Sequence, residues 1–219
     1  MRPDSAFITL EGVEGCGKST QSHLLVRSLK QAGVEVNLTR EPGGTDFAEQ
    51  VRALVLSDAA GDLPPMAELF LYLGARAEHV ARRIAPYLAA GTTVVCDRFS
   101  DATIAYQGHG RGLPLDKVTQ AAAWAENTSP DLTLLFDLPV ATSLARLSGR
   151  GGNNRFDREA EDFHQRVRDG YLALAKAHPE RIVVIDADQP LEAVHADVVK
   201  IVGERLGLPA LSIAREAEV

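Results

Sequence analysis

Short apolar runs alternate with longer segments of helical spacing along this chain. Each of the five runs leads into a polar turn: "AFITLEG", "VEVNLTREPGG", "TTVVCDR", "LTLLFD" and "RIVVIDAD". Runs that are apolar at almost every position are typical of strands buried on both faces. The main segments between the runs carry apolar residues three or four positions apart, which predicts helices over Lys18–Ala32, Met66–Ala90, Leu115–Glu126, Asp157–Ala177 and Leu191–Leu206.

Glycine and proline indicate where these helices begin and end. Gly33 and Gly91 stand at C-terminal cap positions, and Pro65 stands at a first-turn position. Pro86 should bend or end the helix predicted over Met66–Ala90. Buried strands that alternate with helices predict an α/β protein in which a five-stranded parallel sheet is covered by helices on both faces.

Acidic residues end four of the five predicted strands, at Glu11, Asp97, Asp137 and Asp186. In parallel sheets the carboxyl ends of the strands form the rim where ligands bind. We therefore expect the site at this rim, although not all four carboxylates can be catalytic.

Composition limits the class of protein. The 219 residues are 45% hydrophobic and contain no Pro/Gly/Ser-rich linker, which predicts a single domain over 1–219. The net charge of −7 opposes loose binding to nucleic acid or to anionic membranes. The N-terminus lacks the apolar core of a secretion signal, and no stretch approaches the roughly 18 apolar residues of a membrane span. We expect a cytoplasmic protein whose two cysteines are reduced.

The segment "GVEGCGKST" after the first strand matches the phosphate-binding pattern G-x-x-x-x-G-K-[ST] in full. Its backbone N–H groups would surround phosphate oxygens, and the following helix adds its positive dipole end. Lys18 would reach the β- and γ-phosphates, and Ser19 would bind Mg²⁺. The expected ATP-binding residues are Gly12, Val13, Glu14, Gly15, Cys16, Gly17, Lys18, Ser19 and Thr20.

A phosphate loop alone fits a kinase, a motor, an ATPase or a GTP-dependent switch. A guanine-specific switch needs an N-K-x-D motif after a strand, and the sequence has none. The D-x-x-G match at Asp58–Gly61 lies in a helix-to-loop stretch instead of at a strand end.

A second anion site is predicted near Asp97. This residue ends the third strand, where it could accept a hydrogen bond from Ser19 or from a Mg²⁺-bound water. Arg98 follows it and could bridge donor and acceptor phosphates with its planar fork. Tyr72 and Arg76 are four apart and so share a helix face, which suits either a base joined to a phosphate or an ordinary amphipathic helix.

Four arginines surround a Gly/Asn-rich segment after the fourth strand: Arg146, Arg150, Arg155 and Arg158. Glycine and asparagine give mobility, and arginine gives charge for a phosphoryl group in transfer. We expect a mobile lid near residues 147–158 that closes over ATP. The alternative is a solvated loop that is basic by chance.

These segments together resemble thymidylate kinases of the bacterial type, from Phe7 to about Leu206. The block "DRFSDATIAYQGHGRGL" is the most specific part, and "TREPGGT", "PDLTLLFD", "NRFDREAEDFHQRV" and "DADQPLEAV" support it. The resemblance implies a three-layer P-loop nucleoside monophosphate kinase fold, a homodimer, and Mg²⁺-dependent transfer of a phosphoryl group from ATP to dTMP for dTTP synthesis.

The resemblance also implies roles for single residues. Tyr72 would stack on thymine, Thr103 and Gln107 would bind the base, and Tyr106 would lie against the deoxyribose. Arg76 and Arg98 would hold the dTMP phosphate. Glu14 would approach the 3′-hydroxyl, and Glu41 and Arg52 would border the monophosphate pocket.

Gly15 stands where one group of these enzymes carries an arginine. The chain therefore resembles the other group, in which lid arginines supply the charge, and Arg150 and Arg155 are the candidates. The expected catalytic residues are Lys18, Arg98, Arg150 and Arg155, and the expected metal ligands are Ser19 and Asp97. Two alternatives stay open: a kinase for UMP, CMP or GMP, and a P-loop switch or assembly ATPase.

Overall fold

The protein, described here from a computed structural model, contains one parallel sheet. The structure describes residues 5–57, 63–149, 155–208, 211 and 213. The strands lie in the order β2-β3-β1-β4-β5, so the strand that leads into the phosphate loop is central. Their bounds are β1 Phe7–Gly12, β2 Val36–Arg40, β3 Thr93–Asp97, β4 Leu132–Asp137 and β5 Ile182–Asp186. All four neighbouring pairs are parallel, as the sequence predicted.

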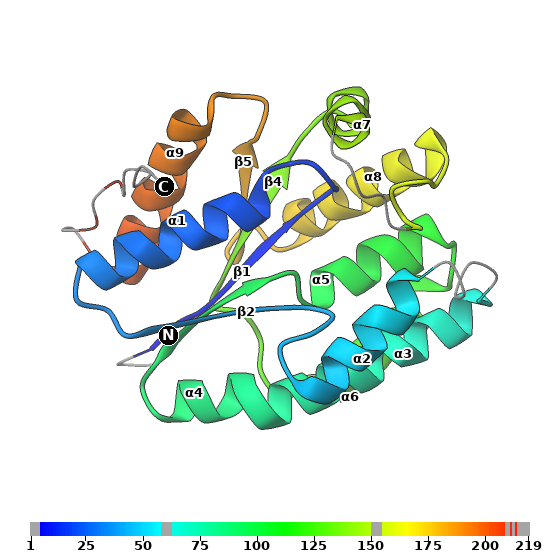
Figure 1. Cartoon of the computed structure of the whole chain (residues 1–219), viewed down its shortest axis with the longest axis horizontal. Helices are drawn as coiled ribbons and strands as arrows, with labels where there is room; N and C mark the ends of the chain where they lie inside the picture. The colour runs from blue at the N-terminus through cyan, green and yellow to red at the C-terminus, as the bar shows by residue number, and fades with distance from the viewer. Residues whose placement is uncertain (1–4, 58–62, 150–154, 209–210, 212, 214–219) are drawn as a thin grey trace.

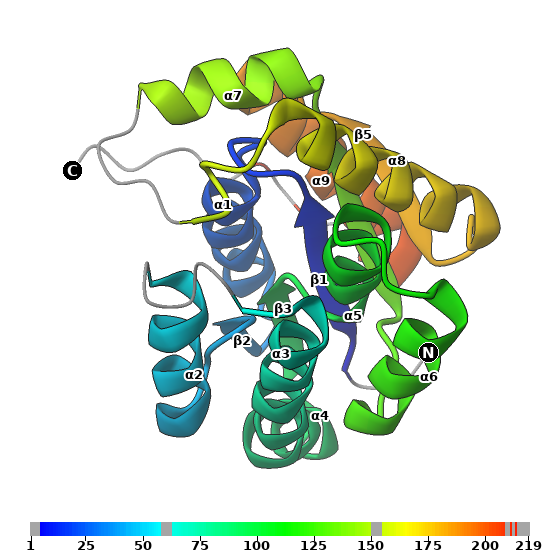
Figure 2. The ribbon, with the colours of Figure 1, turned by 90° about the vertical axis from the view of Figure 1, so that its right-hand side faces the viewer.

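Helices cover both faces of this sheet (Figures 1 and 2). Helices α1 and α9 pack on one face, and α4, α5 and α8 pack on the other. The helical segments are α1 Lys18–Gln31, α2 Asp46–Leu56, α3 Pro65–His79, η2 Val80–Ile84, α4 Ala85–Ala89, α5 Ser100–Thr103, η3 Ile104–Gly110, α6 Leu115–Ala125, α7 Val140–Ser148, α8 Glu161–Ala177 and α9 Leu191–Leu206. The three-layer α/β architecture is confirmed.

The central strands β1, β3 and β4 are buried because they are apolar on both faces, whereas the edge strands β2 and β5 are partly exposed. All six residues of β1 are buried. The main core continues through the apolar faces of α1, α8 and α9, and a second cluster lies between β3 and the segment from η2 to α4. In the described part of the chain, none of the helices has the length and apolar character that crossing a membrane requires.

Pro86 does not end its helix. The helical course that begins at Pro65 continues to Ala89, but it passes through the π-helical segment η2 just before the proline. The amide of Ala85 bonds the carbonyl of Val80, five residues back. Since Pro86 has no N–H to donate, the wider spacing re-registers the hydrogen bonds around it.

The start predicted for helix α8 is wrong by four residues. The helix begins at Glu161 instead of Asp157. Residues 155–158 form a turn in which the amide of Glu159 bonds the carbonyl of Phe156, and Phe156 is buried among aromatic rings. Because the Phe156 side chain is buried in the core, residues 155–158 stay in this turn and the helix begins after them.

Three elements were absent from the sequence prediction: α2, the α5–η3 segment and α7. Helix α2 has a local signal, since the Thr45 hydroxyl accepts a bond from the amide of Ala48 as an N-cap. The α5–η3 segment contains glycines that look like a loop in sequence. They are required by packing, because a Cβ on Gly110 would lie 2.7 Å from the ring of Phe163.

Candidate active site

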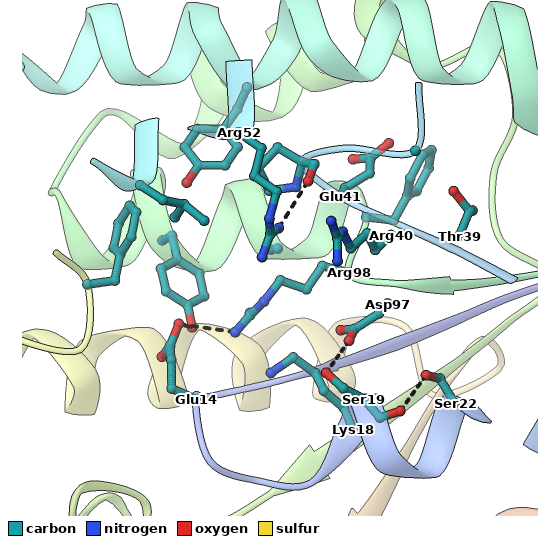
Figure 3. Close-up of a pocket in the computed structure, with 18 of the residues that line it drawn as sticks. Glu14, Lys18, Ser19, Ser22, Thr39, Arg40, Glu41, Arg52, Asp97 and Arg98 are labelled. Carbon is teal, nitrogen blue, oxygen red and sulfur yellow. Dashed lines mark hydrogen bonds and ion pairs between the residues drawn. The ribbon is translucent and has the colours of Figure 1, made fainter. Parts of the chain in front are cut away.

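One pocket of about 700 Å³ lies at the carboxyl ends of β1, β2 and β3. Its walls come from the phosphate loop and the start of α1, the turn after β2, helix α3 and the segment after β3. Figure 3 shows the nitrogen ends of Lys18, Arg52 and Arg98 pointing into this space from three different elements. Cationic groups from three elements therefore converge on the pocket, which Glu14, Glu41, Glu49, Asp97 and Asp157 also line.

The phosphate loop has the backbone conformation that the motif requires. Gly12, Gly15 and Gly17 have positive φ angles. A Cβ on Gly12 would lie 2.5 Å from the carbonyl oxygen of Phe136, so only glycine fits there. Helix α1 begins at Lys18 and directs its positive end at the loop. The Lys18 ammonium is buried and donates to the carbonyl of Val13 at 3.1 Å.

Cys16 and Thr20 differ in their position. Cys16, expected among the ATP-binding residues, is buried in the main core. Thr20 is exposed and lines the pocket, together with Glu14, Gly15, Gly17, Lys18 and Ser19.

Ser19 and Asp97 meet at the centre of the site. The Ser19 hydroxyl donates to Asp97 Oδ2 at 2.5 Å, as the sequence predicted (Figure 3). Hydroxyl and carboxylate oxygens suit a hard cation such as Mg²⁺, which takes its other ligands from water and phosphate. In the described residues no group of three His, Cys, Asp or Glu side chains is placed to bind a metal by itself.

Arg98 joins the phosphate loop to the second half of the pocket. Its guanidinium donates to the carbonyl of Gly12 at 3.0 Å and to Glu14 Oε1 at 3.1 Å. It also lies over the ring of Tyr106, 4.9 Å from the centroid, and the Tyr106 hydroxyl donates to Glu14 at 2.6 Å. Burial opposes ionisation of Glu14, but the charges of Arg98 and Lys18 and this hydrogen bond lower its pKa below the ordinary value.

Arg76 is held in a buried network. Its Nε donates to Glu41 Oε2 at 2.6 Å, and its Nη2 donates to the carbonyl of Phe99 at 3.0 Å. Glu41 Oε1 lies 3.0 Å from His79 Nδ1, and His79 Nε2 lies 2.7 Å from the Thr39 hydroxyl. Burial lowers the pKa of Arg76, but Glu41 more than offsets this, so the pKa is raised. Arg76 Nη1 has no hydrogen-bond partner among the described residues and lies on the pocket wall.

The opposite part of the pocket is more apolar. Tyr72 lies against Phe156 in an edge-to-face arrangement with ring centroids 6.5 Å apart. Gln107 Nε2 donates to Glu68 at 2.8 Å, which fixes the orientation of its amide. The buried Thr103 hydroxyl has no partner within the described ranges. Arg52 borders this wall and donates to the carbonyl of Pro42 at 3.0 Å. The predicted substrate-binding residues are thus brought together.

The lid arginines are a different case. Arg150 lies outside the residues that the structure describes. Arg155 is buried, and it donates to Glu68 Oε2 at 2.5 Å and to the carbonyl of Val55 at 2.6 Å, away from the phosphate loop. Arg146, which the sequence grouped with the lid arginines, donates to the carbonyl of Gly15 at 3.4 Å.

Sequence reasoning missed three contributors to the site: Phe156, His79 and Tyr171. Phe156 lines the pocket, His79 supports Glu41, and the Tyr171 hydroxyl lies 3.1 Å from Arg98 Nη1. All three lie in segments predicted as helix or lid. In the sequence of such a segment, an aromatic residue of the site looks the same as an aromatic residue of the core. Asp137 and Asp186 serve the fold instead, since Asp137 pairs with Arg168 and Asp186 accepts from the amide of Asp188.

Comparison with known proteins agrees with this geometry. The family model for thymidylate kinase matches residues 10–198. The chain belongs to the thymidylate kinase family. It is 49% identical over 210 residues to the thymidylate kinase of Trichlorobacter lovleyi, covering 93% of this chain and 99% of that protein. The Geobacter sp. (strain M21) thymidylate kinase is 52% identical over 187 residues, covering 82% and 83% of the two chains.

A solved structure gives the same result at the level of the fold. The crystal structure of thymidylate kinase from Ehrlichia chaffeensis superposes with a TM-score of 0.75 and 38% identity, covering 91% of this chain and 99% of that one. The family resemblance predicted from the sequence is confirmed. As a member of this thymidylate kinase family, the protein is a nucleoside monophosphate kinase, and a switch or assembly ATPase is not favoured.

Proposed function

We propose that the protein transfers the γ-phosphoryl group of ATP to dTMP, giving ADP and dTDP for dTTP synthesis. The observation that carries this proposal is the continuity of one pocket from Lys18 and Ser19 to Arg76 and Tyr72, with Arg98 between them. ATP phosphates fit the loop end. A nucleoside monophosphate fits the other end, its phosphate facing the arginines and its base facing Tyr72.

The reaction needs no general base. A phosphomonoester has a second pKa near ~6, so the attacking phosphate oxygen is already anionic at neutral pH. Catalysis then depends on holding donor and acceptor in line and on neutralising charge in the transition state. Lys18 can supply charge at the β- and γ-phosphates, and Arg98 can contact both phosphates from its position beside Glu14.

Ser19 and Asp97 are the proposed ligands of Mg²⁺. When bound with ATP, the ion neutralises charge on the phosphate oxygens. The hydrogen bond between Ser19 and Asp97 supports the proposal, because it places two oxygen ligands side by side next to the loop that binds phosphate.

The proposed acceptor pocket assigns each wall to one part of dTMP. Tyr72 stacks on thymine, Thr103 and Gln107 bind its polar edge, and Tyr106 lies against the deoxyribose. The unpartnered Thr103 hydroxyl supports this, since a buried hydroxyl needs a hydrogen bond. Arg76 binds the phosphate. Its cationic neighbour Arg52 and its carboxylate partner Glu41 border the same subsite.

Arg150 and Arg155 are the proposed lid cations. In the arrangement described, Arg155 pairs with Glu68, so it can contribute charge to a bound nucleotide only after leaving that carboxylate. Glu68 also pairs with Arg111 at 3.3 Å and accepts from Gln107, which lowers the cost of releasing Arg155. The proposal predicts that Arg155→Ala lowers turnover by more than the loss of the ion pair lowers stability.

A homodimer is the proposed assembly. Helices α3 and α6 pack against each other through Leu69, Leu73, Val118 and Ala122. The same pair of helices leaves large apolar side chains exposed: Met66, Phe70, Leu115 and Trp124, the last of them 88% exposed. A contiguous apolar face of this kind is typical of a protein interface. We place the enzyme in the cytoplasm, where ATP and nucleoside monophosphates are made.

A competition between acceptors tests the proposed substrate. Purified protein with ATP and Mg²⁺ is supplied with dTMP, UMP, CMP or GMP in turn, and ADP release is measured with a coupled assay. The proposal predicts the highest kcat/KM for dTMP. A higher kcat/KM for any other monophosphate would assign the acceptor pocket to that nucleotide and contradict the proposal.

A further inference from the structure

Arg98 has an unusual backbone conformation. Its φ is 70°, and it is the one non-glycine residue with positive φ in the described part of the chain. Such a conformation is strained for a residue with a Cβ and persists only where surrounding contacts determine it. The amide of Arg98 bonds the carbonyl of Leu10 at 2.9 Å, and the next amide, that of Phe99, donates to the carboxylate of Glu11 at 2.7 Å.

The same carboxylate also reaches the other end of Arg98. The Tyr171 hydroxyl donates to Glu11 Oε2 at 2.8 Å, and Arg98 Nη1 donates to the Tyr171 hydroxyl oxygen at 3.1 Å. One oxygen of Glu11 therefore holds the backbone beside Arg98, and the second holds its guanidinium through Tyr171.

Glu11 and Tyr171 cannot touch a substrate themselves. They are 0% and 2% exposed, and neither lines the pocket. Arg98 lines it, at the point where the two phosphate subsites meet. We infer that Glu11 and Tyr171 are positioning residues, which fix the Arg98 guanidinium between the donor and acceptor phosphates. This inference rests on the proposed phosphoryl transfer.

The direction of the two hydrogen bonds depends on the charge of Glu11. As a carboxylate, Glu11 accepts from Tyr171, which leaves a lone pair of the tyrosine oxygen for Arg98. As a neutral acid, Glu11 can donate to the same tyrosine oxygen and compete with Arg98 for it. The positioning network is therefore strongest when Glu11 is ionised.

Glu11 titrates in the range where the enzyme can be assayed. Its pKa is raised to about 8. Burial is the main cause and the charge of Asp101 adds to it, while the charge of Arg98 and the bonds from Tyr171 and Phe99 act in the opposite direction. The helices and strands around β1 contribute these titratable or charged groups: Asp101 from α5, Tyr171 from α8, Cys96 and Arg98 from the end of β3, Arg76 from α3, and Arg181 beside β5.

Kinetics of Glu11→Gln and Tyr171→Phe across pH 6.5 to 9.5 test the inference. Wild-type kcat should rise through an ionisation near 8. Glu11→Gln mimics the neutral acid, so its kcat should be about tenfold lower than the wild-type value at high pH, and the step should vanish. Tyr171→Phe removes the oxygen through which Glu11 acts on Arg98, so its kcat should also fall about tenfold and its step should be lost.

Thr9→Val is the matched control. Thr9 lies two residues before Glu11, is fully buried, and bonds the Thr133 hydroxyl at 2.7 Å. This variant should lose some stability and keep both kcat and its pH dependence. The inference is overturned if Glu11→Gln and Tyr171→Phe keep the wild-type profile, or if a lower melting temperature fully accounts for their loss of activity.

A second variant and the wild-type activity keep the inference testable on its own. If Glu11→Gln does not fold, Tyr171→Phe alone decides the test: a lower kcat without the pH step supports the inference, and an unchanged profile overturns it. The wild-type turnover of dTMP reports separately on the proposed function, because the inference concerns only the difference between variants and wild type.

Discussion

Glu14 in the phosphate loop and Arg98 after β3 form an ion pair, with Arg98 Nη2 3.1 Å from Glu14 Oε1. The pair connects the ATP-binding loop to the segment that carries the acceptor pocket. Their side chains are 14% and 17% exposed, so little water screens the interaction. In the proposed site, these contacts hold Arg98 between the donor and acceptor phosphates.

Replacement of Arg98 should affect turnover far more than folding. An arginine that acts on the transition state of phosphoryl transfer contributes about 10³–10⁵ in rate. We expect Arg98→Ala to lower kcat with dTMP by a factor in that range, as measured by ADP release. Its melting temperature should fall by only a few degrees, since the side chain is 17% exposed and Glu14 keeps its hydrogen bond from Tyr106.

Arg27→Ala is a suitable control for that experiment. Arg27 lies on the exposed side of α1 and does not line the pocket. This variant should match the wild type in both measurements. A loss of activity in Arg98→Ala that is fully explained by unfolding at the assay temperature would contradict the proposed catalytic role.

Lys18 should be required for the chemical step. Its stem is buried and its ammonium lies at the carbonyl of Val13, inside the loop. Lys18→Met keeps the stem and removes the charge, so we expect kcat to fall about 10³-fold. Calorimetry should still detect dTMP binding, because Arg76 and Arg98 are intact. Lys30→Met, at the exposed end of α1, should change neither quantity.

Glu11 should make the stability of the protein depend on pH. Between its ordinary pKa of 4.5 and its folded pKa of about 8, it ionises only in the unfolded chain. The free energy of unfolding therefore falls as pH rises through this window, by an amount on the order of a few kcal/mol. Urea melts from pH 6 to 8.5 should show the wild type losing stability relative to Glu11→Gln. Parallel pH dependence in the two proteins would refute the assignment.

Trp124 should matter for assembly. Its side chain is 88% exposed on α6, so Trp124→Glu leaves the core intact. We expect light scattering to report a dimer for the wild type and a monomer for this variant. Val184→Glu introduces the same charge at a 46% exposed position on β5 and should remain dimeric. A monomeric wild type at micromolar concentration would contradict the proposed interface.

The parallel sheet could be predicted because its signal is local. Each strand is a short apolar run, and a strand such as β1 is buried along its whole length. The π-helical segments η2 and η3 could not be predicted, since no spacing of apolar residues marks a change from four-residue to five-residue hydrogen bonding. Gly110 of η3 fits tightly against Phe163 of α8, and Gly108 against Leu115 of α6, contacts that exist only in the folded chain.

The candidate site also has a part that the sequence predicted and a part that it did not. Ser19 and Asp97 were predicted as neighbours because a motif and a strand end place them on one rim, and they are hydrogen-bonded. Tyr171 was not predicted as part of the site, because the sequence of an amphipathic helix does not show that one of its tyrosines contacts a buried carboxylate. Arg155 was expected near phosphate from its place in the arginine-rich segment and from the family resemblance. Its burial against Glu68 depends on the tertiary packing of α3.

Direct detection of the product tests the central claim most directly. The full chain is incubated with dTMP, ATP and Mg²⁺, and the nucleotides are separated by chromatography. The account predicts that dTDP and ADP form in equal amounts and that neither forms when dTMP or Mg²⁺ is left out. ADP formation that is independent of dTMP, with no dTDP produced, would contradict it.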